Sequence, residues 1–96
     1  MAVSPSTRFA VPDHVLVREV GGESVLLNLQ SETYFGLDET GTRIWSALTR
    51  YPSVEEACRA LLTEFEVEPE RLERDVAELA GTLMDKGLLA LAGGDA

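Results

Sequence analysis

The sequence predicts an α+β domain of winged-helix-like content, in which a three-stranded antiparallel sheet is followed by three α-helices. Two observations point to this class. Before residue 38, short runs alternate between apolar and polar side chains, which is the period of a half-buried strand. After residue 38, apolar side chains recur at the three- and four-residue spacing of amphipathic helices. The chain has 96 residues, which is enough for one domain with a single modest core.

The predicted domain occupies residues 13–91. Residues 1–12 contain Pro5 and Pro12 and are expected to form an irregular N-terminal segment. Residues 92–96 form a short segment with Gly93 and Gly94, which we expect to be a disordered tail.

Three strands form the predicted sheet. Residues 15–20 make the first strand, and Gly21-Gly22 ends it because paired glycines tolerate the positive φ angles of a tight hairpin turn. The return strand covers Ser24 to Gln30, and Ser31-Glu32 turns the chain into a third strand, Thr33 to Leu37. Each strand is therefore expected to pair with the next in an antiparallel meander.

Capping signals divide the rest of the chain into three helices. Asp38 is a natural N-cap for a helix that runs to about Arg50. Ser53-Val54-Glu55-Glu56 is a capping box that opens the second helix, whose apolar spacing continues to Phe65. The third helix begins at Pro69 and stops at Gly87. Residues 88–91 are expected to add a short closing strand or to pack as coil.

The charge of the chain argues against nucleic-acid binding. Eight Lys and Arg residues stand against seventeen Asp and Glu residues, which gives a net charge of −9. Such a chain repels phosphate backbones, and a third helix this rich in acids would be a poor groove-reading helix. The charge instead favours cationic partners.

The sequence offers little for catalysis, metal binding or membrane insertion. Cys58 and His14 are the only residues of their kinds, so neither an internal disulfide nor a His/Cys zinc cluster is expected. Cys58 falls on the apolar face of the second helix and is interpreted as a core residue. No P-loop, H-E-x-x-H or G-x-S-x-G motif occurs. No apolar run is long enough to span a membrane, and the first residues do not form a secretory signal, so a non-enzymatic, cytoplasmic protein is expected.

The strand Thr33 to Leu37 is the strongest candidate for a binding site. As the last strand of a meander, it leaves one row of backbone donors and acceptors open to an added strand. Alternation places Phe35 and Leu37 on one face and Tyr34 and Gly36 on the other, so at least one aromatic side chain is expected to face outward. The alternative is that these aromatics serve only the core. An acidic third helix beside the strand would attract Lys or Arg in a bound peptide.

Several segments, in this order and at this spacing, also resemble a known family. They are Val25-Leu26-Leu27-Asn28, Tyr34 to Gly41, Ile44-Trp45, Ser53 to Ala57, Glu66 to Pro69 and Gly87-Leu88-Leu89. The family is the PqqD-like family, whose members are recognition elements for precursor peptides of ribosomally made, post-translationally modified peptides. The resemblance covers roughly residues 14–91.

Within that family, Arg8 to Pro12 and the strand Tyr34 to Asp38 look most like the stand-alone proteins of lasso-peptide clusters. The resemblance implies that a precursor leader peptide adds as a strand beside Thr33 to Leu37 and lies against the third helix. It also implies an apolar pocket there for a Tyr-x-x-Pro motif of the leader. The implied partners are a leader peptidase of the transglutaminase-like cysteine protease kind and an ATP-dependent macrocyclase resembling asparagine synthetase.

Carried onto this sequence, the resemblance places the leader on two elements. Asp38 stands where many relatives have Asn, which changes the local charge but preserves the helix cap. The expected leader-binding residues are Thr33, Tyr34, Phe35, Gly36 and Leu37 of the strand and Leu72, Asp75, Val76 and Leu79 of the third helix.

Two other functions remain open at this point. One is a PqqD-type peptide chaperone for a radical-SAM enzyme, which would use the same fold and the same binding mode. The other is a winged-helix DNA-binding regulator, which the acidic third helix disfavours.

Overall fold

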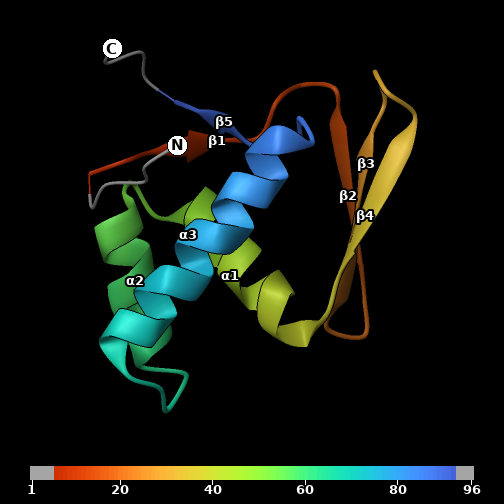
Figure 1. Cartoon of the computed structure of the whole chain (residues 1–96). Helices are drawn as coiled ribbons and strands as arrows, with labels where there is room; N and C mark the ends of the chain where they lie inside the picture. The colour runs from red at the N-terminus through yellow and green to blue at the C-terminus, as the bar shows by residue number, and fades with distance from the viewer. Residues whose placement is uncertain (1–5, 93–96) are drawn as a thin grey trace.

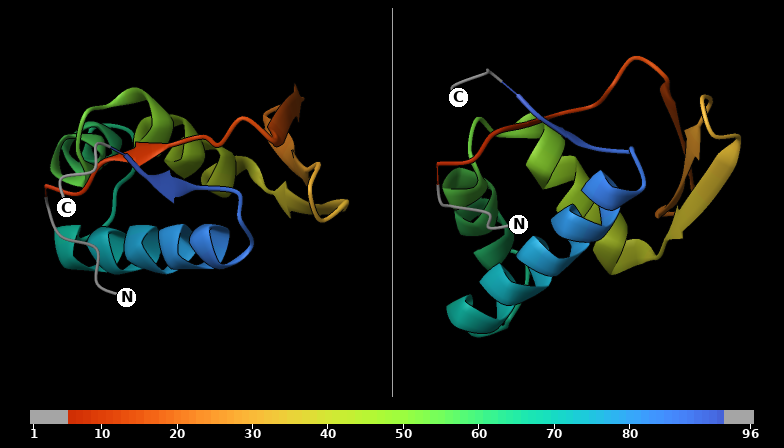
Figure 2. Two further views of the ribbon diagram at one scale, coloured as in Figure 1. Left: turned by 90° about the horizontal axis from the view of Figure 1, so that it is seen from above. Right: turned by 45° about the horizontal axis from the view of Figure 1, so that its top comes forward.

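The sheet and the helices occupy two sides of the molecule (Figure 1). The computed structural model describes residues 6–92. The sheet stands at one end, and all three helices lie on the same side of it (Figures 1 and 2). The elements in chain order are β1 (Phe9–Ala10), β2 (Val15–Val20), β3 (Glu23–Asn28), β4 (Thr33–Leu37), α1 (Glu39–Arg50), α2 (Val54–Leu62), α3 (Pro69–Asp85) and β5 (Ala90–Leu91).

The main sheet is the predicted antiparallel meander, with strand order β2-β3-β4. Leu26 of β3 stands opposite Val17 of β2 and Phe35 of β4. The β2–β3 hairpin turns at Gly21 and Gly22, whose φ angles are +63° and +87°. Both values lie in the left-handed region that only glycine adopts without strain, so the predicted glycine turn is confirmed.

The core lies between one face of this sheet and the three helices. Leu26 is fully buried at the centre of the sheet, and Leu37 is buried at the end of β4. Trp45 of α1, Leu61 of α2 and Leu83 of α3 pack into the same apolar cluster. The α+β fold with three strands followed by three helices is therefore confirmed.

The helices begin where the sequence predicts. The Asp38 carboxylate accepts the Gly41 N–H at 2.7 Å, and the Ser53 hydroxyl accepts the Glu56 N–H at 3.3 Å. α2 ends at Leu62, before the apolar spacing ends at Phe65. There the Thr63 hydroxyl donates to the Ala60 carbonyl at 2.6 Å, a local bond that competes with helix continuation.

The end of α3 is fixed to the sheet. Gly87 has a φ of +71°, and the N–H groups of Gly87 and Leu88 donate to the carbonyls of Met84 and Leu83, which is a Schellman cap. The His14 ring nitrogen lies 3.0 Å from the Gly87 carbonyl, and the Asn28 amide donates to the Lys86 carbonyl at 2.9 Å. These two contacts join the end of α3 to the start of β2 and to the end of β3.

The N-terminal segment is more ordered than expected. β1 pairs with β5 in a second, two-stranded sheet, and Phe9 is buried in the core. The Thr7 carbonyl also accepts the N–H of Val54 at 2.9 Å. A two-residue strand has no periodicity to read, so alternation could not predict it. Residues 1–5 and 93–96, which include most of the predicted tail, lie outside the described residues. No helix within residues 6–92 is both long enough and apolar enough to cross a membrane.

Candidate functional site

The free edge of β4 is the first component of the site. β4 is the last strand of the sheet, and within residues 6–92 no strand pairs with its other side. The Leu29 N–H donates to the His14 carbonyl at 2.8 Å, so the odd-numbered residues of β3 bond toward β2. The even-numbered residues of β3 therefore bond toward β4, where they stand opposite Thr33, Phe35 and Leu37.

It follows that Tyr34 and Gly36 direct their backbone N–H and C=O groups away from the sheet. Four backbone groups are thus available on this edge, two donors and two acceptors. They stand at alternate residues, which is the spacing at which an antiparallel or parallel partner strand bonds. The predicted strand Thr33 to Leu37 has the geometry to accept one.

The two aromatic side chains of β4 have separate positions. Phe35 faces the helices and packs against the core, and the Lys86 ammonium lies 5.5 Å from the centroid of its ring. Tyr34 points from the opposite face of the sheet and is 77% exposed. The expectation that one aromatic faces outward is confirmed, and Tyr34 is that residue.

The C-terminal end of α3 meets β4, and we call the surface between the free edge of β4 and the residues Leu79 and Asp75 of α3 the groove. Because Lys86 contacts Phe35, the residues that share its side of the helix face the same strand. Leu79 and Asp75 precede Lys86 by seven and eleven residues, which is helical spacing. Leu79 is partly buried and Asp75 is exposed, so both are accessible from this side. Leu72 and Val76 are only 4% and 0% exposed, and they support the groove from within the core.

A hollow of about 290 Å³ continues the groove at the start of α3. Its apolar walls are Ile44 of α1, Leu72 of α3, and Phe65 and Val67 of the loop between α2 and α3. Arg71, Asp75 and Thr40 are among its polar lining residues. Thr40 follows β4 by only three residues, so the hollow lies close to the end of the free edge.

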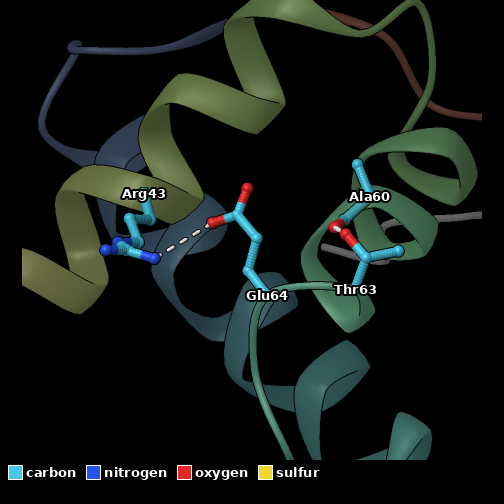
Figure 3. Close-up of polar contacts among 4 residues, drawn as sticks. All are labelled: Arg43, Ala60, Thr63 and Glu64. Atoms are coloured by element: carbon cyan, nitrogen blue, oxygen red, sulfur yellow. Dashed lines mark hydrogen bonds and ion pairs between the residues drawn. The ribbon is translucent and has the colours of Figure 1, made fainter.

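A polar contact holds the loop that carries Phe65. The Arg43 guanidinium of α1 pairs with the Glu64 carboxylate at 3.2 Å (Figure 3). The same guanidinium lies 5.8 Å from the centroid of the Phe65 ring. Both ions of the pair are about half exposed, so the pair orients the loop more than it stabilises the fold. Ile44, Phe65 and Val67 were not among the predicted site residues. The sequence spacing places Phe65 on the apolar face of the second helix, which predicts a core residue.

The cysteine of the chain lies outside the groove. Cys58 is buried in the core, and burial raises the pKa of its thiol, with a further contribution from the nearby Glu73 carboxylate. Both effects keep the thiol protonated, which is the opposite of an activated nucleophile. Within residues 6–92, no three His, Cys, Asp or Glu side chains are grouped to hold a metal ion.

Comparison with known proteins identifies relatives of this chain. Residues 23–89 match the family described as PqqD, coenzyme PQQ synthesis protein D. Comparison with the curated proteins gave no match. Among solved structures, TbiB1 in complex with the TbiA(beta) leader peptide is 38% identical, with a TM-score of 0.78 over 91% of this chain and 99% of that chain.

A second structure is the lasso peptide synthetase B1 complexed with the leader peptide. It is 29% identical, and the TM-score is 0.78 over 86% of this chain and 98% of that chain. The family match alone spans more than half of the sequence, from the return strand of the hairpin to the end of α3. The chain therefore belongs to the PqqD family.

Proposed function

We propose that this protein is a non-catalytic leader-peptide-binding protein of lasso-peptide biosynthesis. The observation that carries the proposal is the free edge of β4 beside the groove. It is supported by two structural relatives that are bound to leader peptides, one of them a lasso peptide synthetase B1. The leader adds to β4 as a further strand of the sheet.

Backbone hydrogen bonds set the register of the leader but do not supply most of the affinity. Tyr34 and Gly36 offer four outward backbone groups, and each bond contributes a net of about 1 kcal/mol. The sum of about 4 kcal/mol matches a dissociation constant of only about 1 mM. Side chains of the leader must therefore supply the remainder.

The groove provides places for those side chains. Alternate residues of an added strand face the helices, where they meet Leu79 and Asp75. An apolar side chain of the leader enters the hollow lined by Ile44, Phe65 and Leu72, and burying one such side chain contributes about 1.5–3 kcal/mol. Two anchors of this kind would bring the affinity to the micromolar range. The Tyr-x-x-Pro motif implied by the family resemblance is our candidate for these anchors.

The proposed role is to present the leader to separate enzymes. The family resemblance names a leader peptidase of the transglutaminase-like cysteine protease kind and then a macrocyclase. A binding protein whose cysteine is buried and kept protonated suits such a division of labour, because the bound leader stays intact until the peptidase engages it.

Calorimetric titration with a synthetic leader tests the proposal directly. The leader is taken from the precursor gene beside this one, and a scrambled peptide of equal composition is the control. A third peptide carries N-methyl groups on the residues that face Tyr34 and Gly36, which removes their N–H donors. We expect micromolar binding of the native leader and a loss of at least about tenfold on methylation. Equal binding of all three peptides, or of none, contradicts the proposal.

One second function has an observation in its favour. The matching family is described as coenzyme PQQ synthesis protein D, which favours a peptide chaperone that serves a radical-SAM enzyme. Both solved relatives are bound to leader peptides, and one of them is a lasso peptide synthetase B1, so the first proposal is preferred. Neighbouring genes discriminate the two: a protease and a macrocyclase support the first, and a radical-SAM enzyme supports the second.

A further inference from the structure

The far face of the main sheet is apolar and uncovered. We call it the outer sheet face. All three helices lie on the opposite side of the sheet, so nothing within residues 6–92 packs on this one (Figures 1 and 2). Tyr34 is 77% exposed, Val20 72%, Leu16 54% and Val25 46%. By strand alternation and register, the face consists of Leu16, Arg18, Val20, Glu23, Val25, Leu27, Tyr34 and Gly36.

Gly36 makes a hollow in this face that the fold does not require. Its φ is not positive, and a Cβ added there would meet no atom within 4 Å. A glycine inside a strand weakens the strand, and it often marks a place that a ligand or another backbone approaches closely. Val20, Val25 and Arg18 line the open hollow of about 430 Å³ beside Gly36.

Tyr34 is the matching projection. It lies two residues before Gly36 on the same face of the same strand, and it is the most exposed large apolar side chain of the described residues. Because Tyr34 and the hollow beside Gly36 are neighbours on one face, the same face of a second copy is complementary to them. A twofold axis between the two positions places Tyr34 of each copy over the hollow of the other copy.

We propose that the outer sheet face is the interface of a homodimer, in which Tyr34 of each copy enters the hollow beside Gly36 of the other. The axis runs across the strands between the row Leu16–Leu27–Tyr34 and the row Arg18–Val25–Gly36. It places Leu27 over Val25 of the partner subunit, so aliphatic side chains fill the centre. Two sheets that pack in this way lie about 10 Å apart.

The distribution of charge favours this face for contact between two copies. The chain carries a net charge of −9, yet the outer sheet face holds one cation and one anion, Arg18 and Glu23. Acidic side chains concentrate instead on α3 and the loop before it, where Glu66, Glu70 and Glu78 are exposed. Two copies that meet through their outer sheet faces keep these acidic surfaces apart, on the far sides of the dimer. An approach through α3 would instead bring the acidic side chains of the two copies together.

The size of the face predicts a weak dimer. Three strands about 4.8 Å apart and six residues at about 3.4 Å each cover roughly 14 by 20 Å. This is a small area compared with the ~800 Å² that each partner of a stable complex buries. We therefore expect a concentration-dependent equilibrium at micromolar or higher concentrations rather than a permanent dimer.

The homodimer is independent of the proposed leader binding. The leader would use the edge of β4 and the groove on the helix side, whereas the partner subunit covers the opposite face. Leader binding and dimerisation can each fail while the other holds, and they are measured separately.

Sedimentation velocity of the full chain from about 10 µM to about 1 mM tests the dimer. We expect the mass to rise from one chain toward two. Val25→Asp places an unpaired charge at the centre of the interface and should weaken association by at least about tenfold. Leu91→Asp is the matched control, because Leu91 is 56% exposed on β5, away from this face. Circular dichroism melts show whether each variant is folded.

The projection and the hollow are tested by three further variants. Tyr34→Ala removes the projection and Gly36→Val fills the hollow, so each alone should weaken association. The double variant Tyr34→Ala with Gly36→Tyr exchanges the two positions and should regain it. A wild-type chain that stays monomeric throughout overturns the proposal and leaves the face for a different protein. Equal weakening by Val25→Asp and Leu91→Asp, or no recovery in the double variant, also contradicts it.

Discussion

The two edges of the main sheet differ in what lies beside them. β4 and β2 are both edge strands, and each presents alternate backbone groups to the outside. β4 holds Phe35 and Leu37 against the core, and Lys86 at the end of α3 contacts Phe35. β2 is exposed from Leu16 to Val20, on both of its faces, and only Val15 is buried.

The difference shows that an open edge is not by itself a binding site. A peptide added to either strand gains similar backbone bonds, which together match only about millimolar affinity. Beside β4 it also buries side chains in the groove and in the hollow near Ile44. Beside β2 those side chains would stay in water, so a specific complex is expected at β4 alone.

A proline on each edge tests this comparison most strongly. Gly36→Pro removes an outward N–H and places a ring where the leader strand would lie, so we expect leader affinity to fall about a hundredfold. Glu19→Pro makes the same change on β2, because the Glu19 N–H also points outward by alternation. Proline is tolerated at such edge positions, so both variants should fold. Calorimetry with the leader measures the effect, and equal losses in the two variants would contradict the assignment to β4.

Much of this asymmetry could be predicted from the sequence. The strand Thr33 to Leu37, the Asp38 cap and the end of α3 at Gly87 were all predicted, because each depends on neighbouring residues. The hollow could not be predicted, since Ile44 and Phe65 meet only when α1 and α2 pack. Helical spacing placed Leu72 and Val76 on the groove side of α3, but spacing cannot tell how deeply the neighbouring elements bury them.

The contact between α3 and the sheet can be broken at Gly87. A Cβ on Gly87 would lie 2.8 Å from the Asn28 amide nitrogen, which donates to the Lys86 carbonyl. Gly87→Ala therefore combines the cost of a positive φ with the loss of this bond, and should lower the free energy of unfolding by about 2 kcal/mol. Gly21→Ala is the control, because Gly21 has a similar φ but no neighbour within 4 Å, and should cost about 1 kcal/mol. Urea denaturation measures both values, and equal losses would show that the contact contributes nothing.

The core beneath the groove responds to pH through Cys58. Burial and then Glu73 raise the pKa of its thiol, so the folded state holds the proton to higher pH than the unfolded chain. This stabilisation is complete below the pKa of the unfolded thiol and is lost as the pH rises through the folded value. We expect the melting temperature of the wild type to fall more than that of Cys58→Ala between about pH 8 and pH 10. Leader affinity at pH 7 should be the same in both, because Cys58 does not reach the groove.

The smallest expected effect comes from the charge beside β4. Asp75 lies on the side of α3 that faces the strand, and Asp75→Asn should weaken binding of a leader with Lys or Arg two- to threefold, or about 0.5 kcal/mol. Glu73→Gln is the matched control, because two residues turn the helix by about 200° and Glu73 acts on Cys58 instead. Titrations at low and high salt separate the two variants, since screening should remove the effect of Asp75→Asn alone. If both variants weaken binding equally, the leader responds only to the net charge of the chain, and Asp75 has no specific role in the groove.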